Sequence, residues 1–265
     1  MKKTVSTLLS AAIAINSLAS DSITDANKSQ TFVLVHGAWQ APYVWDAVKA
    51  ELTKKGNKVI VVELPGHGND KTPTYTLSMD VYRDKVIEAI STENEKVILV
   101  GHSMGGMVVT SVAEKIPSKI SKLVYIGAFV PVSGQALTDI ADPESKLGPA
   151  LIPSADKLTL DVKADDLTYL FINDGGKAAK QQVTDNYRAE PAIPFTGKVT
   201  ITNENFGSVS KVYIKTLQDI VITPDLQDKM IAAAGIKTVL TVNTSHSPFL
   251  AQPQEVSKLL LSIAK

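Results

Sequence analysis

Cysteine is absent from the 265-residue sequence, and aromatic residues make up only 6% of it. The absence of cysteine excludes a thiolate nucleophile, a disulfide framework, a lipid-modified cysteine and zinc sites with cysteine ligands. An excess of charge of either sign is also absent, because 27 basic residues balance 27 acidic residues. We therefore expect no nucleic-acid partner. What is present is a hydrophobic fraction of 44%, which is sufficient for one globular domain with a substantial core.

The N-terminal segment has the composition of a secretory signal peptide. Two lysines precede an apolar stretch that Ser and Asn interrupt, and small residues surround Ala19. The stretch is shorter than the roughly 20 predominantly apolar residues that a membrane span requires. We therefore expect residues 1–19 to be a signal peptide cleaved near Ala19, residues 20–29 to be a mobile leader, and the mature chain to be periplasmic or secreted without stable membrane insertion. Cleavage would remove two lysines and no acidic residue, which leaves a net charge of −2.

Short runs rich in β-branched residues alternate with helical patterns along most of the chain. Runs that are apolar along nearly their whole length are typical of strands in a parallel sheet that is covered on both faces. Apolar residues at a period near 3.6 predict the intervening helices. The predicted strands are residues 31–35, 58–62, 96–100, 122–126, 211–216 and 237–242, and the predicted helices include residues 44–52, 86–90, 107–112 and 253–263.

This alternation fails between residues 132 and 207, a stretch rich in Pro, Gly and Asp. Residues 175–186 have a helix-like pattern, and residues 158–162 alternate as a strand does. Because so long a structureless connection is uncommon in a compact domain, we interpret residues 132–207 as an inserted cap. The cap follows the fourth predicted strand, so we expect it to cover the active site, with residues 30–131 and 208–265 forming the core.

Ser103 lies in a pattern typical of a nucleophile that is presented between a strand and a helix. The motif Gly101-His102-Ser103-Met104-Gly105 follows an apolar strand run and precedes a helical pattern. Gly101 and Gly105 would leave room for the sharp turn. The backbone N–H of Met104, directly after the serine, is a candidate donor to an oxyanion.

A serine nucleophile needs a base, and the base needs a third group that orients it. His246 follows the last predicted strand, and a loop at the carboxyl end of a parallel strand is a suitable place for a catalytic base. For a serine turn of this kind the acid is expected between the serine and the histidine in sequence. Asp219, just after the strand at residues 211–216, is the preferred acid. Asp225 and Asp228 are alternatives at the start of a predicted helix.

The turn after the first predicted strand, His36-Gly37-Ala38-Trp39, is expected to supply the second oxyanion donor. Gly37 would let the backbone come close, Ala38 is the preferred donor, and Trp39 is the alternative. Gly37 and Trp39, together with Tyr169 and Phe171 of the cap, are candidate substrate-binding residues.

These segments resemble the α/β-hydrolase superfamily, over nearly the whole chain after the signal peptide. They look in particular like its branch of plant methyl esterases, hydroxynitrile lyases and related bacterial esterases. The resemblance implies an α/β fold with a mostly parallel central sheet, helices on both faces and an inserted cap. It also implies a serine hydrolase that cleaves small carboxylic esters with an apolar acyl or aryl group, and neither a metal nor an organic cofactor. The matching segments are residues 32–39, 101–106, 171–174, 191–195, 213–219 and 245–249.

Three alternatives share this framework. Hydroxynitrile lyases of the rubber-tree type carry Thr after the first-strand histidine and Lys after the catalytic histidine, whereas this chain has Gly37 and Ser247. Without a cation beside His246 nothing would stabilise departing cyanide, which disfavours cyanohydrin cleavage. A small-molecule receptor with a vestigial site would bind ligand without turnover. Perhydrolysis or carbon–carbon bond hydrolysis would use the same triad with different pocket walls. The sequence makes no prediction of oligomeric state.

Overall fold

The computed structural model describes residues 29–140 and 142–264. The predicted signal peptide at residues 1–19, and the predicted leader up to residue 28, lie outside the described residues. Within the described ranges, no helix has both the length and the apolar character needed to cross a bilayer.

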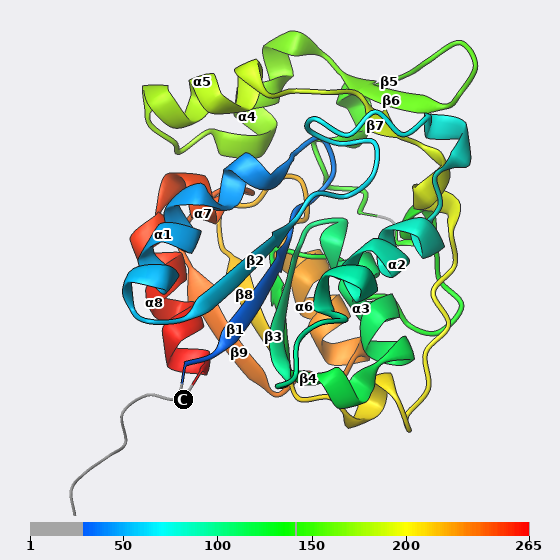
Figure 1. The fold of residues 1–265 in the computed structure, drawn as a ribbon. Coiled ribbons are helices and arrows are strands. Elements are labelled where there is room, and N and C mark those ends of the chain that lie inside the picture. Colours follow the sequence, from blue (N-terminus) through cyan, green and yellow to red (C-terminus); the bar gives the residue numbers. More distant parts are fainter. Residues whose placement is uncertain (1–28, 141, 265) are drawn as a thin grey trace, which may run out of the picture.

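Six parallel strands form the central sheet in the described part of the chain (Figure 1). The predicted α/β class and all the predicted core strands are confirmed, with ends that differ by a few residues; the third strand, for example, continues to His102. The strand order in the sheet is β2-β1-β3-β4-β8-β9. The strands are β1 (Thr31–Val35), β2 (Lys58–Val62), β3 (Val97–His102), β4 (Ile120–Ile126), β8 (Lys211–Thr216) and β9 (Thr238–Val242).

Helices cover both faces of this sheet, which explains why its strands are apolar along their length. Phe32 and Leu34 of β1 pack on one face with residues of α1, α7 and α8, whereas Val33 and Val35 pack on the other face with residues of α2, α3 and α6. Figure 1 shows the two helical layers on opposite sides of the strands. The helices are α1 (Asp46–Lys54), α2 (Met79–Ile90), α3 (Gly105–Lys115), α6 (Pro224–Ala233), α7 (Pro248–Ala251) and α8 (Pro253–Ile263).

Local sequence sets several of these helix starts. The Ser78 hydroxyl accepts the N–H of Val81 at 3.2 Å and caps α2, and the Thr223 hydroxyl accepts the N–H of Leu226 at 3.3 Å and caps α6. The helix α8 begins at Pro253. Proline lacks a backbone N–H, but the first N–H groups of a helix have no partner within the helix, so no hydrogen bond is lost. These caps fix where each connection leaves the sheet and becomes a helix.

The strand order reverses at β1, because β2 lies on one side of it and β3 on the other. In open parallel sheets, ligand sites form at such a switch point, beyond the carboxyl ends of the two strands. Here the turn after Val35 and the turn after His102 meet at this place.

The strands and α-helices of residues 132–207, which we call the cap segment, lie above the carboxyl ends of the central strands (Figure 1). An isolated bridge between Gln135 and Val199 joins its two ends. Because the cap segment faces the edge of the sheet where the loops converge, it is placed to enclose the site. Its elements are the antiparallel strands β5 (Leu151–Pro153), β6 (Thr159–Val162) and β7 (Glu190–Pro191), and the helices α4 (Leu167–Ile172) and α5 (Lys177–Asp185).

Candidate active site

Ser103 occupies a strained turn between β3 and α3. Its φ angle of 52° lies in the left-handed region, which non-glycine residues adopt only where the surroundings hold them there. A Cβ added to Gly101 would lie 2.7 Å from the carbonyl oxygen of Gly105, and one added to Gly105 would lie 2.7 Å from the carbonyl oxygen of His36. The two glycines therefore supply the room that the sequence led us to expect.

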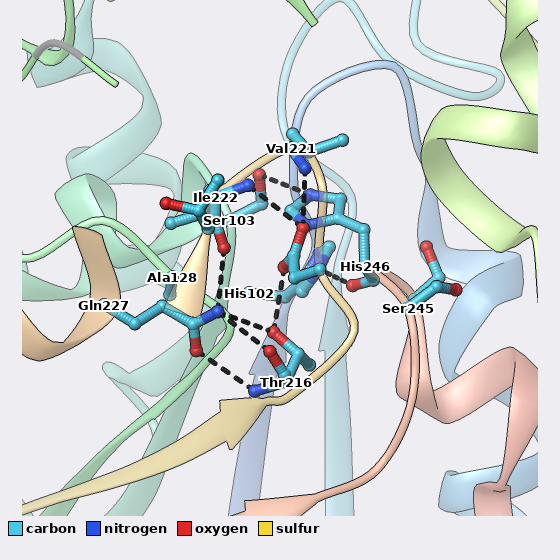
Figure 2. Close-up of polar contacts among 12 residues, drawn as sticks. His102, Ser103, Ala128, Thr216, Val221, Ile222, Gln227, Ser245 and His246 are labelled. Carbon is cyan, nitrogen blue, oxygen red and sulfur yellow. Dashed lines mark hydrogen bonds and ion pairs between the residues drawn. The ribbon is translucent and has the colours of Figure 1, made fainter. Parts of the chain in front are cut away.

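A chain of hydrogen bonds joins Ser103, His246 and Asp219 (Figure 2). Nδ1 of His246 lies 2.8 Å from Oδ2 of Asp219, and Nε2 lies 3.0 Å from Oγ of Ser103. Because a carboxylate only accepts, Nδ1 carries the proton and Nε2 is left to accept from the serine hydroxyl. His246 is 1% exposed, Asp219 is 2% exposed and Ser103 is 6% exposed. The arrangement is that of a serine activated by a buried base.

Asp219 is held in place by backbone and hydroxyl donors. Its Oδ1 accepts the N–H groups of Val221 at 2.8 Å and Ile222 at 3.0 Å, and its Oδ2 accepts the Thr216 hydroxyl at 2.8 Å. These bonds hold the carboxylate in place and fix the oxygen that faces the histidine.

The two alternative acids lie elsewhere. Asp228 is exposed and forms an ion pair with Lys215, and Asp225 is exposed in the first turn of α6. Of the three candidates, the structure brings only Asp219 to the histidine.

Gln227 is a buried supporting residue that sequence reasoning missed. Its Nε2 donates to the carbonyl oxygens of Thr216 at 3.1 Å and Ile222 at 2.8 Å, and its Oε1 accepts the N–H of Thr216 at 3.0 Å (Figure 2). It thereby joins the two stretches of backbone that hold Asp219. The available signal was a polar residue one turn before Ile231 on the buried face of α6.

Two backbone N–H groups, one in each of the adjoining turns that carry Gly37 and Ser103, have no hydrogen-bond partner among the described residues. In the part of the chain that the structure describes, neither the Ala38 N–H nor the Met104 N–H donates a hydrogen bond. The Trp39 N–H, in contrast, donates to Oε2 of Glu190 at 2.7 Å. The alternative in which Trp39 is the oxyanion donor is therefore wrong, because this donor is already engaged by a carboxylate.

Gly37 allows the two turns to approach each other. A Cβ at this position would lie 2.7 Å from Cβ of Ser103 and 2.8 Å from Nδ1 of His102. Real side chains do not tolerate such contacts, so the close approach requires glycine. The predicted role of Gly37 in bringing the backbone close agrees with this geometry.

An aromatic wall stands above the triad. The ring of Trp39 lies 5.7 Å from that of Phe171 and 5.9 Å from that of Phe195, between ring centroids. The Phe171 ring in turn lies 6.1 Å from the His246 ring. The predicted contribution of Tyr169 does not fit, because Tyr169 is 51% exposed on the outer face of α4, whereas Phe171 faces inward.

His36 and His102 hold loops and stay neutral. Burial and the neighbouring His67 lower the pKa of His36 to about 3, and its ring binds the carbonyl oxygen of Gly37 and the N–H of Leu64. Burial holds the pKa of His102 well below its usual range, and its Nε2 donates to the carbonyl oxygen of His246 at 2.8 Å. Among the described residues, no group of three or more His, Asp or Glu side chains is placed to hold a metal ion.

Relatives of known sequence share this framework. The alpha/beta hydrolase family model matches residues 32–259. The putative chloroplastic methylesterase 14 of Arabidopsis thaliana is 30% identical over 249 residues, which cover 88% of this chain and 72% of that protein. Methylesterase 7 of the same plant is 29% identical over 270 residues, which cover 91% of this chain and 98% of that protein.

Solved structures agree in fold. Polyneuridine aldehyde esterase has a TM-score of 0.80 at 23% identity and covers 90% of this chain and 100% of its own. A pyrethroid hydrolase from Sphingobium faniae has a TM-score of 0.79 at 21% identity and covers 89% of this chain and 97% of its own. The family match, which spans most of the sequence, goes beyond a likeness of fold. The chain belongs to the alpha/beta hydrolase family.

Proposed function

We propose that this protein is a serine hydrolase that cleaves small carboxylic esters through an acyl-enzyme intermediate on Ser103. The observation that carries the proposal is the continuous hydrogen-bonded chain from Ser103 through His246 to Asp219, beside two unengaged backbone N–H groups. The methylesterase relatives and the family match support the reaction class.

Each group has one role in this reaction. His246 Nε2 takes the Ser103 proton as Oγ attacks the ester carbonyl, and Asp219 stabilises the imidazolium that forms. The N–H groups of Ala38 and Met104 bind the developing oxyanion. The imidazolium then gives its proton to the leaving alcohol, and the acyl group stays on Ser103. Water, deprotonated by the same nitrogen, releases the acid and restores the serine.

The aromatic wall supports an apolar acyl or aryl group in the substrate. Trp39, Phe171 and Phe195 are each nine-tenths or more buried and contact one another, and the Phe171 ring lies beside the His246 ring. Such walls favour apolar ligand parts and leave orientation to a few polar groups. Related proteins are named for methyl esters, for polyneuridine aldehyde and for pyrethroids, which is consistent with uncharged esters.

Cyanohydrin cleavage is not favoured. Ser247, the residue after the base, is fully buried, and its hydroxyl accepts a hydrogen bond from Gln40 at 2.8 Å. This neutral pair occupies the place where a lyase of the rubber-tree type would carry a cation. A threonine at position 37 would collide with the serine turn.

The test is a Ser103→Ala variant with a panel of aryl and methyl esters that vary in acyl length. Wild-type protein should turn over uncharged short-chain esters and become labelled on Ser103 by an organophosphonate, and the variant should do neither. Wild-type turnover by the Ser103→Ala variant would contradict the assignment of Ser103 as the nucleophile. Tight ligand binding with a single acylation burst and no steady state would favour the receptor. Preference for charged phosphoesters or peptides would contradict the assignment of an apolar pocket.

We also propose that the chain is exported and cleaved near Ala19. The two lysines, the interrupted apolar stretch and the small residues before Ser20 support a signal peptide. N-terminal sequencing of protein from periplasmic and culture fractions tests this. A full-length chain that stays in the cytoplasm would contradict it.

A further inference from the structure

Glu190, the first residue of β7 in the cap segment, is fully buried next to the catalytic turns. Its Oε2 accepts the Trp39 N–H at 2.7 Å and faces Nε2 of His67 at 2.9 Å. Its Oε1 is buried without a hydrogen-bond partner among the described residues. A buried carboxylate is unfavourable unless its charge is compensated, so its retention here calls for a cause.

We propose that Glu190, paired with protonated His67, is a positioning residue that holds the Ala38 N–H in the oxyanion hole. The inference rests on the proposed function and deepens it, because it assigns the cap segment a part in stabilising the transition state. Neither residue touches the substrate. Both act through the turn that carries the donor.

The clamp on this turn has two sides. Trp39 is held at a φ angle of 57°, in the left-handed region, by its N–H bond to Glu190 and by the indole Nε1 bond to the carbonyl oxygen of Leu160 at 2.9 Å. On the other side, Gly37 lies so close to Ser103 that an added Cβ would be 2.7 Å from the serine Cβ. Ala38 lies between these two fixed points, which determine where its N–H is directed. Loss of the Glu190 bond would release one of them.

The hydrogen bonds of His67 require the imidazolium. Nδ1 faces the carbonyl oxygen of Pro65 at 3.2 Å, and Nε2 faces the Glu190 carboxylate. With Glu190 ionised both partners are acceptors, so both ring nitrogens donate. Burial lowers the pKa of His67, but the charge and hydrogen bond of Glu190 outweigh burial and raise it above its usual value. The compensated pair adds no net charge beside the oxyanion.

Deprotonation of His67 would leave an uncompensated carboxylate next to the hole, where it would repel the developing oxyanion. We therefore expect kcat to fall as the pH rises through the raised pKa of His67. No neighbouring group would supply the positive charge that His67 loses. Burial lowers the pKa of His36, so this ring is already neutral at the pH where His67 titrates. Burial raises the pKa of Tyr82 and Tyr187, so both phenols stay protonated and uncharged. The titratable and charged groups around the pair are His36 after β1, Asp70 in the loop of His67, Tyr82 on α2, and Tyr187 and Arg188 before β7.

The experiment compares Glu190→Ala, Glu190→Gln and His67→Gln with a matched carboxylate control. Glu114→Ala is suitable, because Glu114 accepts hydrogen bonds from the loop at 202–206 at the far end of α3 from the serine. We expect Glu190→Ala to lower kcat about 10²-fold, as loss of an oxyanion donor does, with little change in KM. Its affinity for benzeneboronic acid, which forms a tetrahedral adduct on the serine, should fall in parallel.

The conservative variant separates position from charge. Glu190→Gln keeps an oxygen that can accept the Trp39 N–H, so it should recover most of kcat at neutral pH and lose the alkaline fall in rate. His67→Gln should leave Glu190 uncompensated and depress kcat across the pH range. Nitrogen NMR of wild-type protein should show His67 protonated at neutral pH, with a lower pKa in Glu190→Gln. The measurements on Glu190→Gln, His67→Gln and wild-type protein do not require Glu190→Ala, so they test the inference even where Glu190→Ala does not fold.

Three results would overturn the inference. One is a Glu190→Ala variant that loses stability as Glu114→Ala does but keeps kcat and boronate affinity. The second is an alkaline fall in rate that persists unchanged in Glu190→Gln. The third is a neutral His67 at neutral pH in the wild type. Failure of the proposed function is distinguishable, because wild-type protein would then show no Ser103-dependent ester turnover at all.

Discussion

The central sheet and the cap segment contribute to the site in different ways. The sheet supplies Ser103, Asp219 and His246 from the ends of its strands, and these three are joined to one another by hydrogen bonds. The cap segment supplies none of them. Instead, Asp174 accepts the N–H and hydroxyl of Ser245, beside the base, and Glu190 accepts the N–H of Trp39, beside the oxyanion donor.

The two regions also differ in what holds them. The loops of the sheet are fixed by apolar packing on two sides and by a close approach of backbone at Gly37. The contacts of the cap segment with the catalytic loops include bonds to carboxylates, buried at Glu190 and partly exposed at Asp174. Such bonds are stronger than neutral hydrogen bonds and depend on charge. The sheet thus determines which groups react, and the cap segment adjusts how they are oriented. Variants that affect one region and spare the other test this division.

The largest effect is expected at the acid of the sheet. Asp219→Asn should lower kcat by on the order of 10⁴-fold, because the amide favours the wrong histidine tautomer. The control is Asp228→Asn, which removes only an exposed ion pair with Lys215 and should leave kcat unchanged. Steady-state kinetics on an aryl ester measures both. A large loss of kcat in Asp228→Asn instead would mean that the catalytic acid is Asp228 on α6 and not Asp219.

The close approach of the two turns comes next. Gly37→Ala places a Cβ 2.7 Å from Cβ of Ser103, so the turns must separate. Since displacement of a reacting group by about 1 Å typically lowers the rate about 10²-fold, we expect a loss of that size in kcat. Gly148→Ala is the control, because no atom lies within 4 Å of a Cβ added there. Full activity in Gly37→Ala would show that the close approach of the two turns is not needed to position the reacting groups.

The same division explains what the sequence could predict. Ser103, Asp219 and His246 follow strands whose apolar runs are visible in the sequence. Because a parallel sheet brings the carboxyl ends of its strands to one edge, the common location of the three residues could be predicted. Glu190 has no such signature, because its partners Trp39 and His67 are 151 and 123 residues away and its burial depends on the docked cap segment.

The inward face of α4 was equally hidden. This helix has six residues, too few for its apolar period to distinguish Phe171 from Tyr169. The ends of the central strands, in contrast, differ from the prediction by only a few residues. Strands such as β1 and β3 are buried on both faces, so their apolar runs are visible in the sequence.

A smaller effect is expected where the cap segment meets the base. Asp174→Ala removes from the buried Ser245 two acceptors that belong to an exposed carboxylate, so we expect only the net contribution of an ordinary hydrogen bond, about 0.5–1.5 kcal/mol, to be lost. Because this loop carries His246, we expect about a tenfold loss in kcat at constant KM. Asp139→Ala provides the control, since Asp139 accepts only the Ala136 N–H among the described residues. Equal losses in the two variants would contradict a specific role for Asp174.

The smallest effect concerns the apolar wall. Phe171→Leu keeps an apolar side chain at a buried position, so its stability penalty should stay below about 1.5 kcal/mol. Loss of the ring beside Trp39 and His246 removes an aromatic contact worth about 0.5–1.5 kcal/mol, which should raise KM for aryl esters a few-fold with kcat nearly unchanged. Tyr169→Leu, on the exposed face of the same helix, should leave both constants at wild-type values. A larger change in KM from Tyr169→Leu than from Phe171→Leu would mean that substrate approaches from the outer side of α4, and the cap segment would then recognise substrate by a surface other than the aromatic wall.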